Sequence, residues 1–217
     1  FVAMTCIVGG DTAAKVLSAG GANPLFVAWI RFALAGVVLL PFMGLSRKDS
    51  ASLKDPLLYL RAALIAGGIC GILTALRTEP IANAFGAFFI GPIVAYVLAV
   101  VVLKERITWA RTVLLAISFG GVLMVVKPGF GLTPGIGFAL LAGCLHGAYL
   151  TTTRAAAPNH RPRVLLISQL LIGTVLLAPL GLSTLPDTLS GGDMVLLALS
   201  AGGSALGNLI LVTLSKS

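Results

Sequence analysis

Three charged residues, Asp11, Lys15 and Arg31, lie within stretches of sequence that are otherwise apolar. Asp11 and Lys15 are four residues apart, so a helix places them on one face, where they can form an ion pair. Charges in an apolar medium are costly and persist only beside a partner or water. Two cations and one anion leave a net positive spot that favours a carboxylate or phosphate group. The structural alternative is a buried bridge from Asp11 to Lys15 or Arg31 that fixes helix packing.

A second group of residues with chemical potential lies later in the chain. His146 is near the middle of an apolar stretch, and Tyr149 follows about one helical turn later. An imidazole titrates near pH ~6.5 and can therefore serve proton coupling or contact a substrate, whereas the alternative is a hydrogen-bonded core histidine. Trp29 either stacks on a substrate or anchors its helix at the membrane interface. We expect Asp11, Lys15 and Arg31 to border a polar cavity shared with His146 and Tyr149. The candidate substrate-binding residues are Asp11, Lys15, Trp29, Arg31, His146 and Tyr149.

The elements that must position these residues are long apolar helices. A membrane-spanning helix needs ~20 residues to cross ~30 Å of hydrocarbon. Eight stretches approach that length and lack the alternating period of barrel strands, so the sequence predicts an all-α polytopic membrane protein. Pro92 is expected to kink the fourth stretch. The stretches cover residues 1–19, 24–45, 57–76, 80–103, 108–127, 133–154, 163–182 and 193–214.

The composition agrees with a protein shaped by lipid. Of the 217 residues, 58% are hydrophobic and 10% are charged, and the mean hydropathy is +1.04. The net charge of +8 does not predict nucleic-acid binding, because no soluble face is large enough to carry a basic patch. The sequence has no phosphate-binding loop, metal-binding pattern or other cofactor motif, so we expect no cofactor and no metal.

The basic residues predict the orientation of the chain in the membrane. We number each loop by the apolar stretch that it follows. If the first helix runs outward, the even-numbered loops lie on the cytoplasmic side and hold most of the lysines and arginines, whereas the odd-numbered loops hold Arg77 and Lys127. By the positive-inside rule, residues 46–55 and 155–163 and both visible ends are cytoplasmic, and residues 183–192 face outside. The basic residues assigned to the cytoplasmic side are Arg47, Lys48, Lys54, Arg61, Lys104, Arg106, Arg111, Arg154, Arg161, Arg163 and Lys216.

The sequence also contains an internal repeat, carried by two matches in the same order. Residues 34–45 align with residues 171–182, and residues 63–68 align with residues 198–203 at nearly the same offset. This offset makes the repeat unit five helices, and an odd number gives successive units opposite orientations in the membrane. We therefore predict an inverted-topology repeat, with spans 1–5 in residues 1–129 and spans 6–8 in residues 133–217. The second unit needs two more helices, so we expect a fragment of a ten-helix protein.

Residues 80–129 combine an Ala-rich helix containing a proline, a Leu-x-Glu ending and a Gly-Val helix that closes on Lys-Pro-Gly. This linked set resembles the EamA-like branch of the drug/metabolite transporter superfamily. Asp11, Lys15 and Arg31 resemble the bacterial subgroup that includes carriers for S-adenosylmethionine and riboflavin. The residues that carry the branch resemblance are Pro92, Leu103, Glu105, Gly121, Val122, Lys127, Pro128 and Gly129.

The resemblance and the repeat together imply a secondary transporter for a small polar organic metabolite, anionic or zwitterionic, in a bacterial inner membrane. Alternating access between inverted repeats is the expected mechanism. One alternative is a membrane assembly or receptor protein that transports nothing. Another is an intramembrane hydrolase that uses Ser204 with His146, for which a serine and a histidine alone are poor evidence. The partners expected are the metabolite and the lipid bilayer, and no enzymatic activity is expected.

Overall fold

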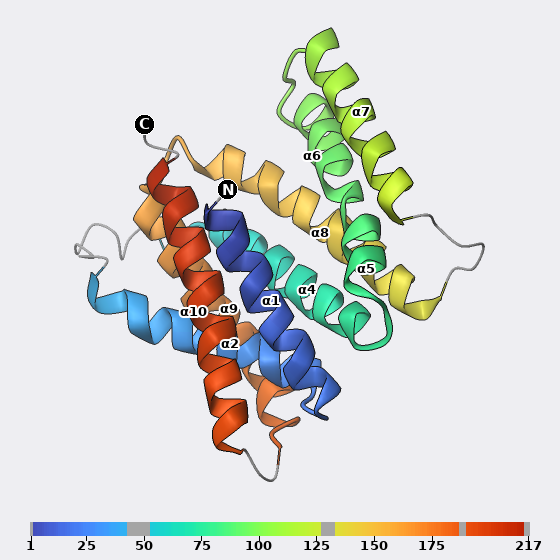
Figure 1. The fold of residues 1–217 in the computed structure, drawn as a ribbon. Helices are drawn as coiled ribbons and strands as arrows, with labels where there is room; N and C mark the ends of the chain where they lie inside the picture. Colours follow the sequence, from blue (N-terminus) through green and yellow to red (C-terminus); the bar gives the residue numbers. More distant parts are fainter. Residues whose placement is uncertain (1, 43–52, 127–132, 187–189, 215–217) are drawn as a thin grey trace. The chain divides into compact units, whose positions relative to one another are not determined.

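The computed structural model describes residues 2–42, 53–126, 133–186 and 190–214, and these residues form helices without a strand (Figure 1). Each of the eight predicted stretches is helical over most of its described length. Two compact units are present, each described here by itself. Unit 1 comprises Phe1–Ala66 and Ala156–Ser217, and unit 2 comprises Gly67–Ala155.

Several helices begin with the same N-terminal pattern, a polar residue followed by proline at the first helical position. Asn23 precedes helix α2 (Pro24–Leu39), and its side chain accepts a hydrogen bond from the Leu25 N–H at 2.9 Å. Asp55 does the same for the Leu57 N–H at the start of α4 (Pro56–Thr78). Thr133 precedes α8 (Pro134–Ala156). These starts follow from local sequence, because the cap satisfies a free N–H and proline has none to lose.

Unit 1 is built around two helix pairs. Helix α1 (Val2–Ala19) packs along α10 (Gly191–Leu214), and α2 packs along α9 (Pro162–Leu182). Glycines permit the close approach: a methyl group added at Gly203 would lie 2.6 Å from the Cys6 carbonyl oxygen, and one at Gly173 would lie 2.7 Å from the Phe32 ring. Small residues of this kind are typical where helices pack closely in membranes. A short 3₁₀ turn, η1 (Leu40–Phe42), follows α2.

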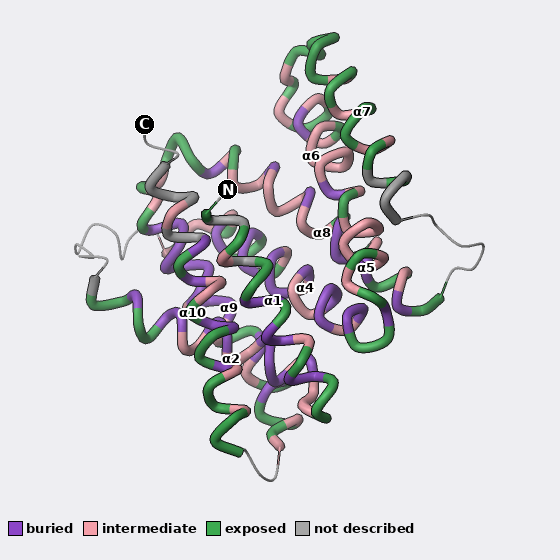
Figure 2. Tube along the Cα trace, in the orientation of Figure 1, coloured by how far each residue is buried: buried purple, intermediate pink, exposed green. Residues whose placement is uncertain are grey.

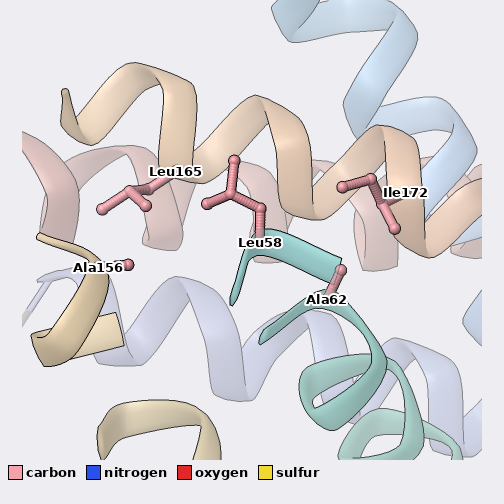
Figure 3. Packing of buried hydrophobic residues seen from close by; sticks show 5 residues of the cluster. All are labelled: Leu58, Ala62, Ala156, Leu165 and Ile172. Carbon is pink, nitrogen blue, oxygen red and sulfur yellow. The ribbon is translucent and has the colours of Figure 1, made fainter. Parts of the chain in front are cut away.

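A cluster of buried apolar residues joins the start of α4 to α9 within unit 1. Leu58 and Ala62 of α4 meet Leu165 and Ile172 of α9, with Ala156 beside them (Figure 3). Residues 164–170 of α9 are all buried (Figure 2). Helix α9 is therefore enclosed by protein over two turns, and any polar group there must find its partner inside the fold.

Unit 2 contains the remainder of α4, followed by α5 (Ile81–Phe88), α6 (Ile90–Val101), α7 (Trp109–Val126) and most of α8. The fourth predicted span is broken at Phe89, between α5 and α6. The break lies three residues before Pro92, which lacks the N–H that would bond to the Phe88 carbonyl. Most described residues of α7 are exposed although the helix is apolar (Figure 2), as expected of a helix in contact with lipid.

Among the described residues, four helical segments are long and apolar enough to cross a membrane, judged by length and composition alone. Pro24–Leu39 is a shorter apolar helix. Together with the remaining helices at the predicted positions, they make the chain an all-α, multi-pass membrane protein. The four segments are Pro56–Thr78, Ile81–Val101, Pro134–Ala156 and Pro162–Leu182.

Candidate functional site

The structure pairs two of the three predicted intramembrane charges. Arg31 of α2 donates from Nη1 to the Asp11 carboxylate of α1 at 2.7 Å. Both residues are buried, at 4% and 8% exposure. The turn at residues 20–23 allows α2 to contact α1. Lys15 is half-buried, one turn from Asp11. The ion pair recorded for Asp11 thus joins two helices, as one of the two structural alternatives foresaw.

The Arg31 guanidinium retains a donor that the protein does not use. Its Nε is buried and has no hydrogen-bond partner among the described residues. The hydroxyl groups of Ser18 in α1 and Ser200 in α10 are likewise buried and unpartnered within the described part of the chain. Buried polar groups are normally satisfied, so each of these invites a ligand or water. The sequence analysis missed both serines. The spacing of seven residues from Asp11 to Ser18, which keeps them on one helix face, could have indicated the first.

Trp29 and Arg31 contact different helices, although both belong to α2. Two residues along a helix turn through about 200°, so the side chains leave α2 on opposite faces. Trp29 lies against Gly181 of α9, with its ring 6.4 Å from that of Phe26. Its Nε1 is buried and lacks a partner among the described residues. Its role in substrate binding stays a prediction.

Arg61 is a buried cation that the sequence analysis placed among the cytoplasmic charges. It is 2% exposed in the second turn of α4. Its Nη1 donates to the Leu165 carbonyl oxygen, and its Nη2 donates to Gln169 Oε1 at 2.8 Å. These partners lie in the buried part of α9. The guanidinium therefore links α4 to α9, and no sequence signal distinguished it from its solvated neighbours.

In unit 2 the structure brings His146 and Tyr149 together and adds an aromatic residue from α5. The centroid of the His146 ring is 5.0 Å from that of Phe88 and 5.7 Å from that of Tyr149. All three residues are half-buried. The sequence analysis missed Phe88, which the break at Phe89 carries to the face of α8. That these residues share a cavity with Asp11, Lys15 and Arg31 stays a prediction.

Polar contacts at the helix ends join segments predicted to lie on the same side of the membrane. His160 Nε2 is 2.7 Å from Asp55 Oδ2, and both belong to predicted cytoplasmic loops. The hydrogen bond from His160, aided by the Leu57 N–H, lowers the pKa of the Asp55 carboxyl below 3.8. Glu105 lies 3.5 Å from Arg154, also on the predicted cytoplasmic side.

On the predicted outer side, Glu79 accepts a hydrogen bond from the Thr133 hydroxyl. Glu79 is only 8% exposed and follows directly after α4. Its side chain occupies the space beside Gly135, where an added methyl group would lie 2.6 Å from it. The sequence analysis missed this buried carboxyl, which links the end of α4 to the start of α8.

Comparison with known proteins is consistent with this architecture. A crystal structure of another protein aligns with a TM-score of 0.69 over 95% of this chain and 76% of its own, at 19% identity, which shows a shared fold. S-adenosylmethionine uptake transporters of Rickettsia prowazekii and Rickettsia felis are each 32% identical over 103 residues, 47% of this chain and 35% of theirs.

A wider match is with an uncharacterized transporter of Archaeoglobus fulgidus, which is 24% identical over 81% of this chain and 63% of its own length. The chain thus spans less than two thirds of these curated relatives. The model of the EamA-like transporter family matches residues 1–127, more than half of the chain. Because the matched part is more than half of the sequence, the chain belongs to the EamA-like transporter family.

Proposed function

We propose that the protein is a secondary transporter that moves a small polar organic metabolite across a bacterial inner membrane by alternating access. The observation that carries the proposal is the buried Asp11–Arg31 pair, whose guanidinium keeps Nε without a partner among the described residues. A buried donor of this kind is costly in a purely structural role. Such a donor is useful where a substrate oxygen can accept its hydrogen bond.

The charge of the site favours a substrate that carries a carboxylate. Asp11 offsets one of the two cations, Lys15 and Arg31, and leaves a positive balance among the three predicted site charges. The Rickettsia relatives are named as uptake transporters for S-adenosylmethionine, which carries a free carboxylate beside an ammonium and a sulfonium group. Its carboxylate makes S-adenosylmethionine the first candidate substrate, with zwitterionic or anionic metabolites next.

Two reciprocal helix contacts support the inverted repeat that alternating access requires. In unit 1, Gly203 of α10 approaches Cys6 and Gly10 of α1. In unit 2, Gly68 of α4 lies so that an added methyl group would be 3.5 Å from the Ala142 carbonyl oxygen of α8. Gly68 and Gly203 are equivalent in the sequence repeat. The third helix of each predicted repeat thus packs on the first helix of the other, as a twofold relation demands.

The proposal is tested by uptake of labelled S-adenosylmethionine into vesicles that contain the purified full-length protein. We expect uptake by the wild type and a loss of about 10-fold or more in substrate affinity for Arg31→Gln, because a charge-assisted hydrogen bond is removed. Arg163→Gln, an exposed arginine of α9, is the matched control and should transport normally.

Binding and thermal unfolding are measured on the same preparations. If Arg31→Gln unfolds at a lower temperature but binds substrate with wild-type affinity, Arg31 is a structural bridge and leaves the site. A folded wild type that moves neither S-adenosylmethionine nor any other zwitterionic or anionic metabolite in a broad panel would contradict the transport function itself.

A further inference from the structure

The break between α5 and α6 fixes where the ring of Phe88, the last residue of α5, lies against α8. Pro92 leaves the Phe88 carbonyl without the N–H that a continuous helix would supply. This carbonyl oxygen points at Gly143 of α8, where an added methyl group would lie 2.5 Å from it. Gly147, one turn later, approaches the Gly91 carbonyl oxygen equally closely. The two glycines allow the backbones to touch, and the Phe88 ring is thereby held against His146.

The ring of His146, which lies between these two glycines in the sequence, is contacted by two aromatic rings. Phe88 and Tyr149 lie 5.0 and 5.7 Å from its ring centroid, at interplanar angles of 42° and 35°. Phe85 extends the group, 6.2 Å from Phe88 and nearly perpendicular to it. No hydrogen bond to a His146 ring nitrogen is found among the described residues. An imidazole in a membrane-spanning helix needs a donor or acceptor for these nitrogens.

We propose that Phe88, His146 and Tyr149 form a subsite for a planar heteroaromatic group that carries a hydrogen-bonding edge. The inference deepens the proposed transport function and rests on it. Aromatic side chains bind flat rings through their faces, and such stacking is tolerant of the identity of the ring. The ring nitrogens of His146 add hydrogen bonds in the plane of the imidazole. A sugar or an aliphatic chain offers no comparable face, so the subsite discriminates against both.

The charges of unit 2 do not favour a carboxylate at this position. The recorded ion pairs within the described part of unit 2 join Glu105 to Arg111 and Arg154, at the ends of helices. His146 lies about two turns before Arg154 along α8. A neutral or electron-poor ring therefore fits the subsite better than an acid.

The experiment uses the purified full-length protein in lipid nanodiscs, with adenosine as the probe and ribose as the non-aromatic control. Binding is measured by titration calorimetry for the wild type, His146→Phe, His146→Gln and Phe88→Leu. His146→Phe keeps a ring without nitrogens, and His146→Gln keeps a hydrogen-bonding group without the ring. Phe138→Leu, an exposed phenylalanine of α8 that lies outside the group, is the matched control. Thermal unfolding without ligand identifies any variant that fails to fold.

We expect adenosine to bind and ribose not to bind. Phe88→Leu and His146→Phe should each weaken adenosine binding about 10-fold, by loss of stacking or of a hydrogen bond, and Phe138→Leu should leave it unchanged. If adenosine binds no better than ribose, or if folded Phe88→Leu and His146→Phe both match Phe138→Leu, the subsite is refuted and the rings pack only against protein and lipid.

Uptake of labelled S-adenosylmethionine by the same wild-type preparation separates the two proposals. Adenosine binding that depends on His146 and Phe88 without uptake of any metabolite supports the subsite while transport fails. Uptake with adenosine binding that is insensitive to both residues supports transport while the subsite fails.

Discussion

The buried pair of Asp11 and Arg31 should respond differently to the loss of one partner and to the loss of both. Removing one partner leaves the other charge buried and alone, which costs about 3–5 kcal/mol, whereas removing both costs far less. We therefore expect Asp11→Asn to lower the free energy of unfolding substantially and Asp11→Asn/Arg31→Gln to recover much of it. The measurement is a double-mutant cycle by chemical unfolding in detergent.

Glu105→Gln is the control for this cycle. Its partners Arg111 and Arg154 are 64% and 59% exposed, at distances of 3.6 and 3.5 Å, so the loss should stay below about 1 kcal/mol. Additive effects of the Asp11 and Arg31 substitutions would show that the two side chains do not act as a pair.

Asp55 gives a residue-level prediction of pH dependence. The hydrogen bond from His160 lowers the pKa of its carboxyl below 3.8. A lowered pKa stabilises the fold above the unfolded pKa, and this contribution is lost as pH falls through 3.8 toward the folded pKa. The difference in unfolding temperature between wild type and Asp55→Asn should thus be constant above about pH 5 and shrink below it. His160→Asn should weaken the same pH dependence, and a difference that persists unchanged to pH ~3 would contradict this assignment.

At the scale of elements, the contact between α8 and the α5–α6 break depends on glycine. The space at Gly143 is filled by the Phe88 carbonyl oxygen and by Ile90, which an added methyl group would approach to 2.5 and 2.7 Å. Gly143→Ala should therefore force these helices apart and cost about 1–3 kcal/mol, as overpacking does. Gly137→Ala is the matched control in the same helix, because nothing lies within 4 Å of the added methyl group. Equal unfolding temperatures for the two variants would exclude a tight contact at Gly143.

At the scale of the whole molecule, the predicted topology can be tested by labelling. The contact of Asp55 with His160 supports a common side for two predicted cytoplasmic loops. We expect Ser190→Cys to react with a membrane-impermeant maleimide in intact cells and Asn159→Cys to react only after permeabilisation. Both positions are exposed, and the three native cysteines are first replaced. Equal labelling of both positions in intact cells would overturn the orientation.

Some features of this protein follow from local sequence alone. Apolar length predicts where helices lie, since the backbone in lipid must satisfy its own hydrogen bonds. Caps such as Asn23–Pro24 and Asp55–Pro56 mark where helices begin, because a cap acts on the next few residues. The positions of the helices involve one helix at a time, which is why the sequence predicted them.

The partners of the polar side chains were decided by tertiary structure. Sequence spacing allowed Asp11 to pair with Lys15, yet the recorded bridge crosses to Arg31 of α2. Arg61 was counted with the cytoplasmic cations, and in the structure it is buried against α9. Phe88 was not selected, although it contacts His146. Periodicity gives the face of a residue on its own helix, whereas these contacts depend on how neighbouring helices are rotated and how closely their glycines let them approach.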